Sequence, residues 1–399
     1  MAAELLAPAG NLERLKWAVE YGADAVYFGI EEFSLRSFAG NFSLSEAQEG
    51  LDYLHKRGRR GYVTLNIYPF SDEYDRLTES AAALDEMGAD AFIVSDLGVI
   101  SELRKLKLRA PLHISTQANT MSYQTVLAYK ELGAKRVNLA RELSLEQIQE
   151  IQRRLSGTCM ETEVFIHGSV CFSYSGRCAI SDYLTGRRAN RGECTHPCRW
   201  NYSLVEEKRP GEYIPVMEDD RGLYLFNTKD LALFPFVPDL VDAGVASLKI
   251  EGRMKNVHYL ASVLSVYRRI LDGKPISEEE VWKLLGRVDN RGYSFGFMKG
   301  TTSQDDYEVD TCRYKSTSTW VLSTTEQVTG ELRVCNVKQR IYAGETFEML
   351  TPDGEISTYT MPAPILRTDG EQVDHANNQD KIFLSKDMPP YTILRRVEI

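Results

Sequence analysis

Short apolar runs alternate with longer helical patterns through roughly the first 270 residues of this chain. Four of the runs follow a glycine placed where it would end the preceding helix, at Gly22, Gly88, Gly133 and Gly244. The predicted strands are Glu4–Pro8, Asp24–Gly29, Gly61–Ile67, Asp90–Ser95, Leu112–Thr116, Arg136–Ala140, Glu163–His167 and Ser247–Glu251. The predicted helices are Leu12–Tyr21, Ser45–Lys56, Asp72–Met87, Leu97–Lys107, Tyr123–Leu132, Leu145–Leu155 and Val257–Leu271. This alternation predicts an α/β fold, a (β/α)8 TIM-like barrel.

One interval between predicted strands is much longer than a βα loop requires. The 79 residues between His167 and Ser247 separate strand seven from strand eight, which predicts an insertion at about 168–245. It leaves from the C-terminal end of strand seven, the end of a barrel where active sites are built. The insertion is therefore expected to contribute to such a site.

The pattern changes after about residue 300. Period-2 runs typical of strands occur at Arg333–Val337, Thr346–Met349 and Ile382–Leu384, separated by turn signals at Thr351–Gly354 and Arg367–Gly370. We expect a barrel domain over 1–300 and a small, barrel-like all-β domain over 310–399.

Four cysteines lie within 28 residues of the insertion, with the spacing C-x6-C-x15-C-x3-C. They are Cys171, Cys178, Cys194 and Cys198. Four thiolates are the ligand set of an iron–sulfur cluster or a structural zinc ion, and the wide, uneven spacing favours a [4Fe–4S] cluster. Buried inert thiols and disulfides are the alternatives. The remaining cysteines, Cys159, Cys312 and Cys335, are expected in the core or on the surface.

The net charge of −10 and the pI of about 5.3 argue against non-specific coating of nucleic acid. A local basic patch is still present within the cysteine segment, either a nucleic-acid contact or a solvated loop. Its residues are Arg187, Arg188, Arg191, His196 and Arg199. The N-terminus lacks the features of a signal peptide, and no run of 18 apolar residues could span a membrane. We expect a cytoplasmic protein that does not enter membranes.

Polar residues end or follow several predicted barrel strands, the position typical of catalytic groups. They are Asn66, Asp96, Gln117, Asn119, Arg141, Glu142, His167, Lys249, Glu251 and Arg253. Glu251 and Arg253 could hold a charged substrate and move a proton. Asp96 is expected to cap the next helix, and His167 is either an acid–base group or a structural residue.

The loop after strand two combines Arg36, Asn41 and aromatic residues. Such groups can stack on an unpaired base. The alternative is a packed loop that places Ser43 or Ser45 as a helix cap.

Several of these segments together resemble a known family. They are Ala7-Pro-Ala-Gly10, Arg36…Asn41-Phe42, Glu163-x-Phe165-x-His167-Gly168-Ser-Val-Cys171-x6-Cys178, Gly192-Glu-Cys194-Thr-His-Pro-Cys198-Arg-Trp200, Asn227-x-Lys-Asp-Leu231, Lys249-x-Glu-Gly-Arg253 and Asn290-Arg-Gly-Tyr-Ser-Phe-Gly296. The sequence resembles the collagenase-like peptidase family of unknown catalytic type, peptidase family U32, and most of all its transfer-RNA uridine 5-hydroxylase branch. The resemblance covers essentially the whole chain.

The resemblance implies an RNA-modifying enzyme that forms 5-hydroxyuridine at the wobble position of transfer RNA. Prephenate would serve as co-substrate in place of molecular oxygen, and a [4Fe–4S] cluster would be held by the four cysteines of the insertion. Arg36, Lys249 or Arg253 could bind the prephenate carboxylates, and the basic patch and the β-domain would bind RNA. A paralogous subunit of the same family could be a further partner.

The sequence is also compatible with other functions. They are a collagenase-like peptidase, a hydroxylase of ribosomal RNA or of the ubiquinone ring, and a non-catalytic subunit that binds RNA or carries a cluster. The presence of all four cysteines in one segment argues against the ubiquinone branch, which takes one ligand from elsewhere. No H-E-x-x-H zinc-peptidase motif occurs.

Overall fold

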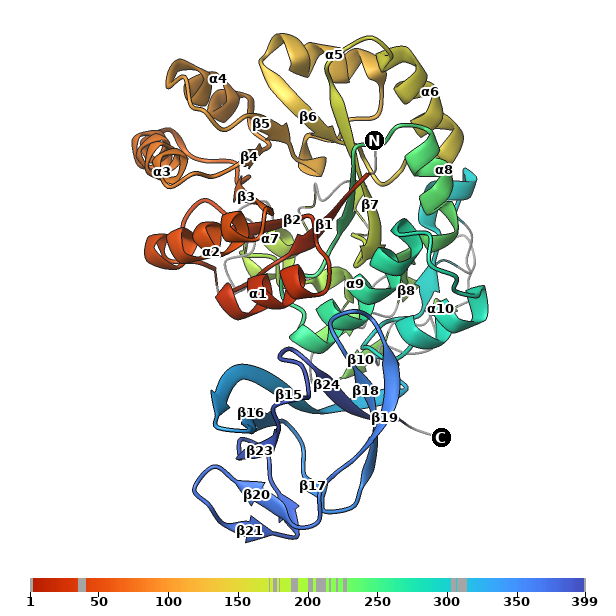
Figure 1. Ribbon diagram of the computed structural model, residues 1–399. Helices are drawn as coiled ribbons and strands as arrows, with labels where there is room; N and C mark the ends of the chain where they lie inside the picture. Colours follow the sequence, from red (N-terminus) through yellow and green to blue (C-terminus); the bar gives the residue numbers. More distant parts are fainter. Residues whose placement is uncertain are drawn as a thin grey trace. The chain divides into compact units, whose positions relative to one another are not determined.

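A computed structural model of the protein describes residues 3–34, 41–171, 173–174, 178, 180–187, 193–199, 204–205, 213–214, 217–219, 222–224, 228–302, 306 and 314–397. The chain divides into two compact units (Figure 1). The first comprises residues 1–19, 23–255 and 290–314, and the second comprises residues 20–22, 256–289 and 315–399.

Eight parallel strands form a closed barrel, as the sequence predicts. They are β1 (Glu4–Pro8), β2 (Ala25–Gly29), β3 (Arg60–Leu65), β4 (Ala91–Val94), β5 (Leu112–Ile114), β6 (Ala134–Asn138), β7 (Glu161–Gly168) and β13 (Ser247–Ile250). Each strand from β1 to β7 pairs with the next, and β13 pairs with both β7 and β1 and so closes the ring. Because all eight strands are parallel, their C-terminal ends meet at one mouth.

Helices alternate with these strands along the chain. They are α1 (Leu12–Glu20), α2 (Leu44–Lys56), α3 (Tyr74–Glu86), α4 (Leu97–Lys105), α5 (Tyr123–Glu131), α6 (Leu145–Leu155), α8 (Val237–Asp242) and α9 (Val257–Leu271). The side chains of Ser43 and Asp96 cap α2 and α4, as the sequence analysis allows. Gly22, Gly88, Gly133 and Gly244 all have φ between 85° and 92°, a conformation that favours glycine after a helix.

The long interval after β7 contains a return to the barrel that the sequence analysis missed. Strand β12 (Asp230–Ala232) pairs antiparallel with the end of β7, and β14 (Tyr293–Ser294) pairs parallel with β12. The 3-10 helix η6 (Phe234–Phe236) and α8 then lead to β13. The cysteine segment is therefore held between β7 and β12.

Short elements occur within the cysteine segment. They are α7 (Ile180–Thr185), the 3-10 helix η5 (Pro197–Arg199), and the antiparallel pairs β8 (Leu204–Val205) with β9 (Tyr213–Ile214) and β10 (Met217–Asp219) with β11 (Gly222–Tyr224). Both α7 and β11 lie against η5. The 3-10 helix η5, which contains Cys198, is therefore in contact with both an earlier and a later part of the cysteine segment.

The second unit contains the predicted antiparallel all-β domain. Its main sheet has the order β19-β18-β24-β15-β16-β23-β20-β21. The strands are β15 (Ser318–Thr329), β16 (Leu332–Val337), β18 (Thr346–Leu350), β19 (Ile356–Thr360), β20 (Ile365–Arg367), β21 (Gln372–Val373), β23 (Lys381–Ser385) and β24 (Ile393–Val397). A smaller sheet joins β17 (Ile341–Tyr342) to β22 (His375–Ala376).

Helices α9 and α10 (Glu278–Leu285) belong to this second unit. The buried Arg395 of β24 donates to Glu348 at 2.7 Å and to Ser262 of α9 at 2.9 Å. Among the residues described, no helix is both long and apolar enough to cross a membrane.

Charged residues are buried inside the barrel near the N-terminal ends of its strands. Arg136 donates to Glu4 at 2.7 Å and to Glu161 at 2.8 Å, and Glu4 also accepts hydrogen bonds from Tyr62 and Ser247. Burial alone would lower the pKa of Arg136, but the carboxylates of Glu4 and Glu163 hold that pKa above its usual value. The guanidinium therefore neutralises carboxylates that have left water.

Replacing Arg136 should therefore destabilise the folded protein. We expect Arg136→Met to lower the free energy of unfolding by about 3–5 kcal/mol, because it leaves buried carboxylates without their cation. Arg154→Met is the control, since the Arg154–Glu150 pair is exposed and such pairs contribute little. Urea unfolding of both variants checks this, and equal effects would contradict it.

Candidate active site at the mouth of the barrel

Arg253 lies just beyond the end of β13, and its side chain is buried at the mouth. Its Nη1 donates to the hydroxyls of Ser34 at 2.8 Å and Thr64 at 3.0 Å. A Cβ added at Gly29 would lie 2.4 Å from this nitrogen, so the glycine makes room for the guanidinium. Both hydroxyls accept from this nitrogen, so they fix the guanidinium at the mouth of the barrel.

A group of amides and hydroxyls follows β3, β4 and β5. Asn66 Nδ2 donates to Gln117 Oε1 at 3.2 Å, and Ser95 Oγ donates to the same oxygen at 3.2 Å. The Tyr68 hydroxyl donates to the Gln117 carbonyl at 3.0 Å. The structure thus brings together Asn66 and Gln117, which the sequence analysis proposed separately.

Lys249, another predicted site residue, points into the barrel. Its ammonium lies 2.7 Å from the Glu163 carboxylate and 4.4 Å from the centroid of the Tyr27 ring. Both members of the ion pair are buried. This charge is therefore neutralised within the barrel, whereas Arg253 lies at the mouth.

His167 is buried in β7 and lies beside the return strands. Its ring centroid is 5.4 Å from that of Tyr293, and its backbone pairs with Ala232 of β12. Burial lowers the pKa of His167 to about 3, although the Asp230 carboxylate acts in the opposite direction. The imidazole is therefore neutral at ordinary pH.

Glu251 and Gly168 are in close backbone contact at the end of β7. The Glu251 N–H donates to the His167 carbonyl at 2.8 Å. Gly168 has a φ of 109°, and an added Cβ would lie 2.6 Å from the Glu251 carbonyl oxygen. Only glycine fits here, which explains why it follows His167 directly.

The cysteine segment is joined to the mouth and to itself by hydrogen bonds. The Thr228 hydroxyl donates to the carbonyl of Val170 at 2.9 Å, next to Cys171. Ser181 in α7 accepts from the Thr195 N–H at 3.1 Å, which brings the regions of Cys178 and Cys194 together.

Cys198 lies close to a buried ion pair behind the mouth. Arg291 donates to Asp230 at 2.5 Å. Burial opposes the charge of Arg291, but Asp230, and to a smaller extent the Cys198 thiol, raise its pKa. No group of three or more His, Cys, Asp and Glu side chains within the described residues is arranged to hold a metal ion.

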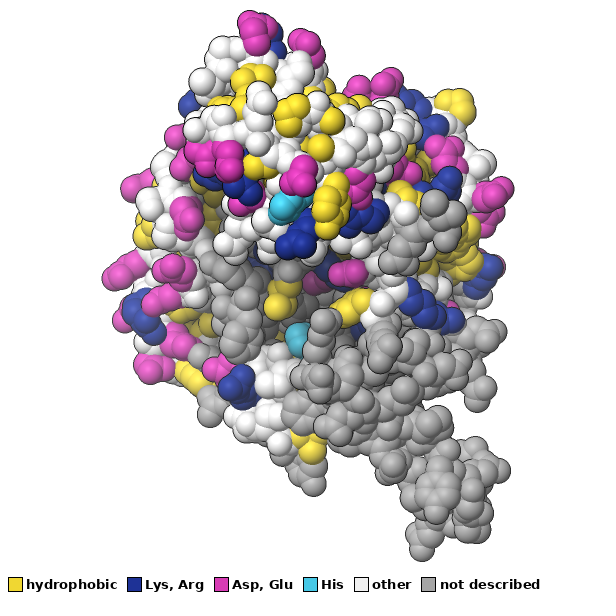
Figure 2. Space-filling view, turned by 90° about the horizontal axis from the view of Figure 1, so that it is seen from below, with side chains coloured by type: hydrophobic (Ala, Val, Ile, Leu, Met, Phe, Trp, Pro, Cys, Tyr) yellow, Lys and Arg dark blue, Asp and Glu magenta, His cyan; other side chains and the backbone are white. Residues whose placement is uncertain are grey.

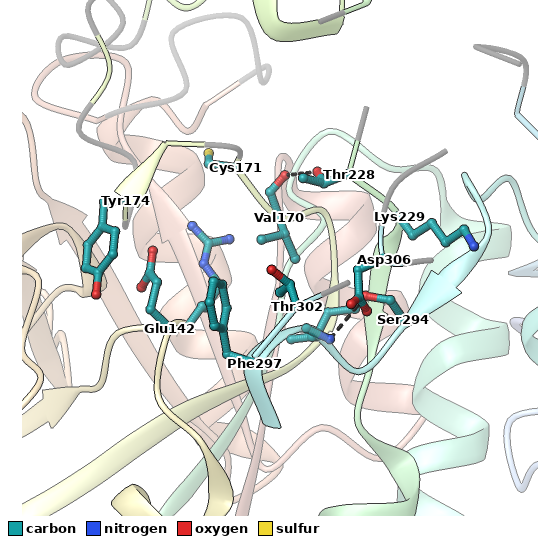
Figure 3. A pocket seen from close by; sticks show the side chains of 13 residues that line it. Glu142, Val170, Cys171, Tyr174, Thr228, Lys229, Ser294, Phe297, Thr302 and Asp306 are labelled. Carbon is teal, nitrogen blue, oxygen red and sulfur yellow. Dashed lines mark hydrogen bonds between the residues drawn. The ribbon is translucent and has the colours of Figure 1, made fainter. Parts of the chain in front are cut away.

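A hollow of about 600 Å3, counting the part open to solvent, lies beside Cys171 (Figure 3). It is bordered by Arg141, Glu142, Val170, Cys171, Tyr174, Thr228, Lys229, Leu231, Ser294, Gly296, Phe297, Thr302 and Asp306. Arg141 and Glu142 were predicted from the end of β6, but Tyr174, Thr228 and Phe297 were not assigned to a site.

Of the other predicted binding residues that the structure describes, Asn41 and Arg187 do not border this hollow. Asn41 is buried with a φ of 30°, and Arg187 is exposed beyond α7. Arg36, Arg188 and Arg191 lie outside the described residues, as does Cys312. Asn119 has a left-handed backbone at the end of a 3-10 helix. Asp96 accepts the Val99 N–H at 3.0 Å, which confirms its role as a helix cap.

The sequence at Gly292–Gly296 matches the G-x-S-x-G motif of serine hydrolases. Ser294 ends the two-residue strand β14, and its Oγ accepts the Gly296 N–H at 3.1 Å. Throughout the described part of the chain, no histidine hydrogen-bonds to Ser294, so the nucleophile–base pair of that chemistry is not assembled.

These features define a (β/α)8 barrel with polar groups at its mouth and a cysteine-bearing insertion beside a pocket. The family model "Peptidase family U32" matches residues 10–308, and "Peptidase family U32 C-terminal domain" matches residues 320–395. The chain belongs to peptidase family U32.

Several curated relatives of this chain carry names that refer to RNA. The chain is 36% identical to tRNA hydroxylation protein P of Escherichia coli (strain K12), over 89% of this chain and 87% of that protein. It is 35% identical to tRNA hydroxylation protein P1 of Bacillus subtilis (strain 168), over 98% and 94%. It is 37% identical to the 23S rRNA 5-hydroxycytidine C2501 synthase of Escherichia coli (strain K12), over 67% of this chain and 39% of that protein.

The buried, neutral His167 should make stability depend on pH. Its pKa is about 3 in the folded protein and about 6.5 in an unfolded chain, so the unfolded state binds more protons below pH 6.5. From pH 7 to pH 5, the wild type should lose about 2 kcal/mol more unfolding free energy than His167→Gln. Chemical unfolding at both pH values measures the difference. An identical pH dependence would mean that the folded imidazole titrates near its ordinary value.

Proposed function

We propose that this chain is an RNA-modifying enzyme that hydroxylates C5 of the wobble uridine of transfer RNA, using a [4Fe–4S] cluster. The observation that carries the proposal is the match, over most of both chains, to two proteins named for tRNA hydroxylation. The position of Cys171 at a pocket beside the end of β7 supports the proposal.

The proposed cluster ligands are Cys171, Cys178, Cys194 and Cys198. Two of their sulfurs already accept backbone hydrogen bonds, Cys178 from Ile180 N–H and Cys194 from His196 N–H, both at 3.4 Å. Such bonds stabilise cluster thiolates and tune their potential. Because Cys171 borders the pocket, a cluster held there would supply electron-transfer chemistry next to a bound substrate.

The reaction replaces the C5–H bond of the base by a C5–OH bond. This change removes two electrons from the base, so it requires an oxygen donor and a two-electron acceptor, and a co-substrate whose C–OH bond is replaced by a C–H bond would supply both. We propose prephenate as the co-substrate and Arg253 as the group that binds one of its carboxylates, since this guanidinium is held at the mouth of the barrel beside the Ser34 and Thr64 hydroxyls. His167, neutral at ordinary pH, would position the substrate by a hydrogen bond, and Glu251 would move the proton.

The RNA backbone requires cations that the barrel interior does not offer. We propose Arg187, Arg188, Arg191 and the β-domain for this role. On the coloured part of the face in Figure 2, acidic and basic side chains are interspersed. A local cluster of cations, and not the overall charge of −10, would have to supply the phosphate contacts.

A peptidase is the second candidate, favoured by the family's description and by the position of Ser294 at the pocket. The ribosomal-RNA alternative is favoured by the relative named as a 23S rRNA 5-hydroxycytidine synthase. The two experiments that follow separate these functions.

The first prediction for this function concerns the cluster. Anaerobically purified protein should be brown and contain about four irons and four sulfides per chain. Changing any one of the four proposed ligands to serine should bleach it, whereas Cys159→Ser, at an exposed cysteine, should leave the colour unchanged. Iron and sulfide analysis and visible absorption check this. Colourless protein with one zinc ion per chain would contradict the cluster assignment.

The second prediction concerns the product. Transfer RNA from cells that lack the gene should contain less 5-hydroxyuridine and fewer of its derivatives than transfer RNA from complemented cells, as measured by nucleoside mass spectrometry. Cys194→Ser should fail to complement, and Cys159→Ser should succeed. Loss of 5-hydroxycytidine from ribosomal RNA alone would favour the ribosomal alternative. Gelatin cleavage that requires Ser294 but no iron would favour the peptidase.

A further inference from the structure

The pocket beside Cys171 has a composition that identifies what it can bind. We call it the Cys171 pocket and define it by Glu142, Cys171, Tyr174, Thr228, Ser294 and Phe297. These residues come from the segments that follow β6 and β7, from the segment leading to β12, from β14, and from the 3-10 helix η7 (Gly296–Lys299). All of them belong to the first compact unit.

The formal charges around the pocket cancel among the described lining residues. The lining includes two cations, Arg141 and Lys229, and two carboxylates, Glu142 and Asp306, so the formal charges sum to zero. Arg141 donates to the Ser169 carbonyl at 3.1 Å and lies 5.2 Å from the Phe165 ring centroid. In Figure 3, the Lys229 side chain extends away from the other labelled side chains. A ligand with two carboxylates needs an excess of positive charge, so this pocket suits an uncharged ligand.

The pocket also offers aromatic surface and hydrogen-bonding groups of both kinds. Figure 3 shows the Glu142 carboxylate between the Tyr174 and Phe297 rings. The Tyr174 hydroxyl contacts the sulfur of Met121 at 3.0 Å, which fixes that ring. Phe297 is half-buried and borders the pocket. Ser294, Thr228 and Thr302 add hydroxyls.

We propose that the Cys171 pocket receives the unpaired target base of the RNA, stacked on Phe297, and that the anionic co-substrate binds elsewhere at the mouth. A nucleobase is planar, uncharged and bordered by donors and acceptors, which matches the lining of this pocket. The position next to Cys171 would bring the base to the proposed cluster. This inference rests on the proposed function and adds to it the place where the base is bound.

The test measures binding of two anticodon stem-loops by the cluster-containing protein. One carries uridine at the wobble position, and the other carries an abasic nucleotide there. The wild type should bind the uridine form about tenfold more tightly, because one base stacked on an aromatic ring contributes that much. Phe297→Leu should abolish most of this difference while the cluster colour remains.

A matched variant controls for general effects on RNA binding. Tyr53→Leu removes an aromatic ring from the outer helix α2, where Tyr53 contacts Arg57. It should keep the full preference for uridine over the abasic form. Prephenate binding, measured by calorimetry, should be the same in Phe297→Leu as in the wild type.

The outcomes separate failure of this inference from failure of the proposed function. If Phe297→Leu keeps the preference for uridine, the base lies elsewhere and the inference is wrong. If Phe297→Leu instead weakens prephenate binding, the pocket belongs to the co-substrate and the inference is also wrong. If the wild type shows no preference although cells with the gene form 5-hydroxyuridine, only the inference fails. If neither the preference nor the modification is found, the proposed function fails with it.

Discussion

The antiparallel pairing of β12 with the end of β7 is the interaction on which the candidate site depends. His167 and Gly168 pair with Ala232 and Leu231, so the chain leaves the barrel and returns to it at the same place. The hydrogen bond between Thr228 and the Val170 carbonyl closes the base of this excursion. Cys171 is the next residue along the chain, and its position at the mouth is therefore set by the barrel itself.

Charge is used in two different ways along the barrel. Near the N-terminal ends of the strands, Arg136 is paired with the Glu4 and Glu163 carboxylates, and all three side chains are buried. At the mouth, the Arg253 guanidinium donates to neutral hydroxyls. A buried ion pair leaves little field for a ligand, and Lys249 is paired in this way with Glu163. Arg253 lies beyond the C-terminal end of β13, where a ligand would bind, and this position is the reason for proposing Arg253, and not Lys249, for carboxylate binding.

Much of the fold could be predicted from local pattern. Helix α6 and helix α9 begin and end at the predicted residues, and the cap at Asp96 follows from its position before Leu97. Strand β12 and helix α8 were missed because they have three and six residues, too short for a periodic signal. Their existence depends on partners distant in the sequence, such as Gly168 and Tyr293.

The site was harder to predict than the fold for the same reason. Lys249 ends a strand and therefore looked like a mouth residue, but strand side chains alternate in direction, and register alone decides that it meets Glu163. Phe297 carries no polar signal and follows β14 beyond the barrel strands, so only the pairing of β14 with β12 brings it to the pocket. The family motif that includes Gly292–Gly296 was visible in the sequence, but its contribution to a pocket wall required the three-dimensional structure.

The neutral pocket and the acidic chain together constrain how an RNA could be held. A stacked base contributes modest and largely salt-independent affinity, whereas phosphate contacts contribute salt-dependent affinity through released counterions. With balanced charges around the described pocket wall and a net charge of −10, the phosphate contacts must come from a separate basic surface. Recognition would then be divided, with the pocket selecting an unpaired base and a distant surface retaining the strand. Such a division suits an anticodon loop, whose bases are accessible while its backbone remains continuous.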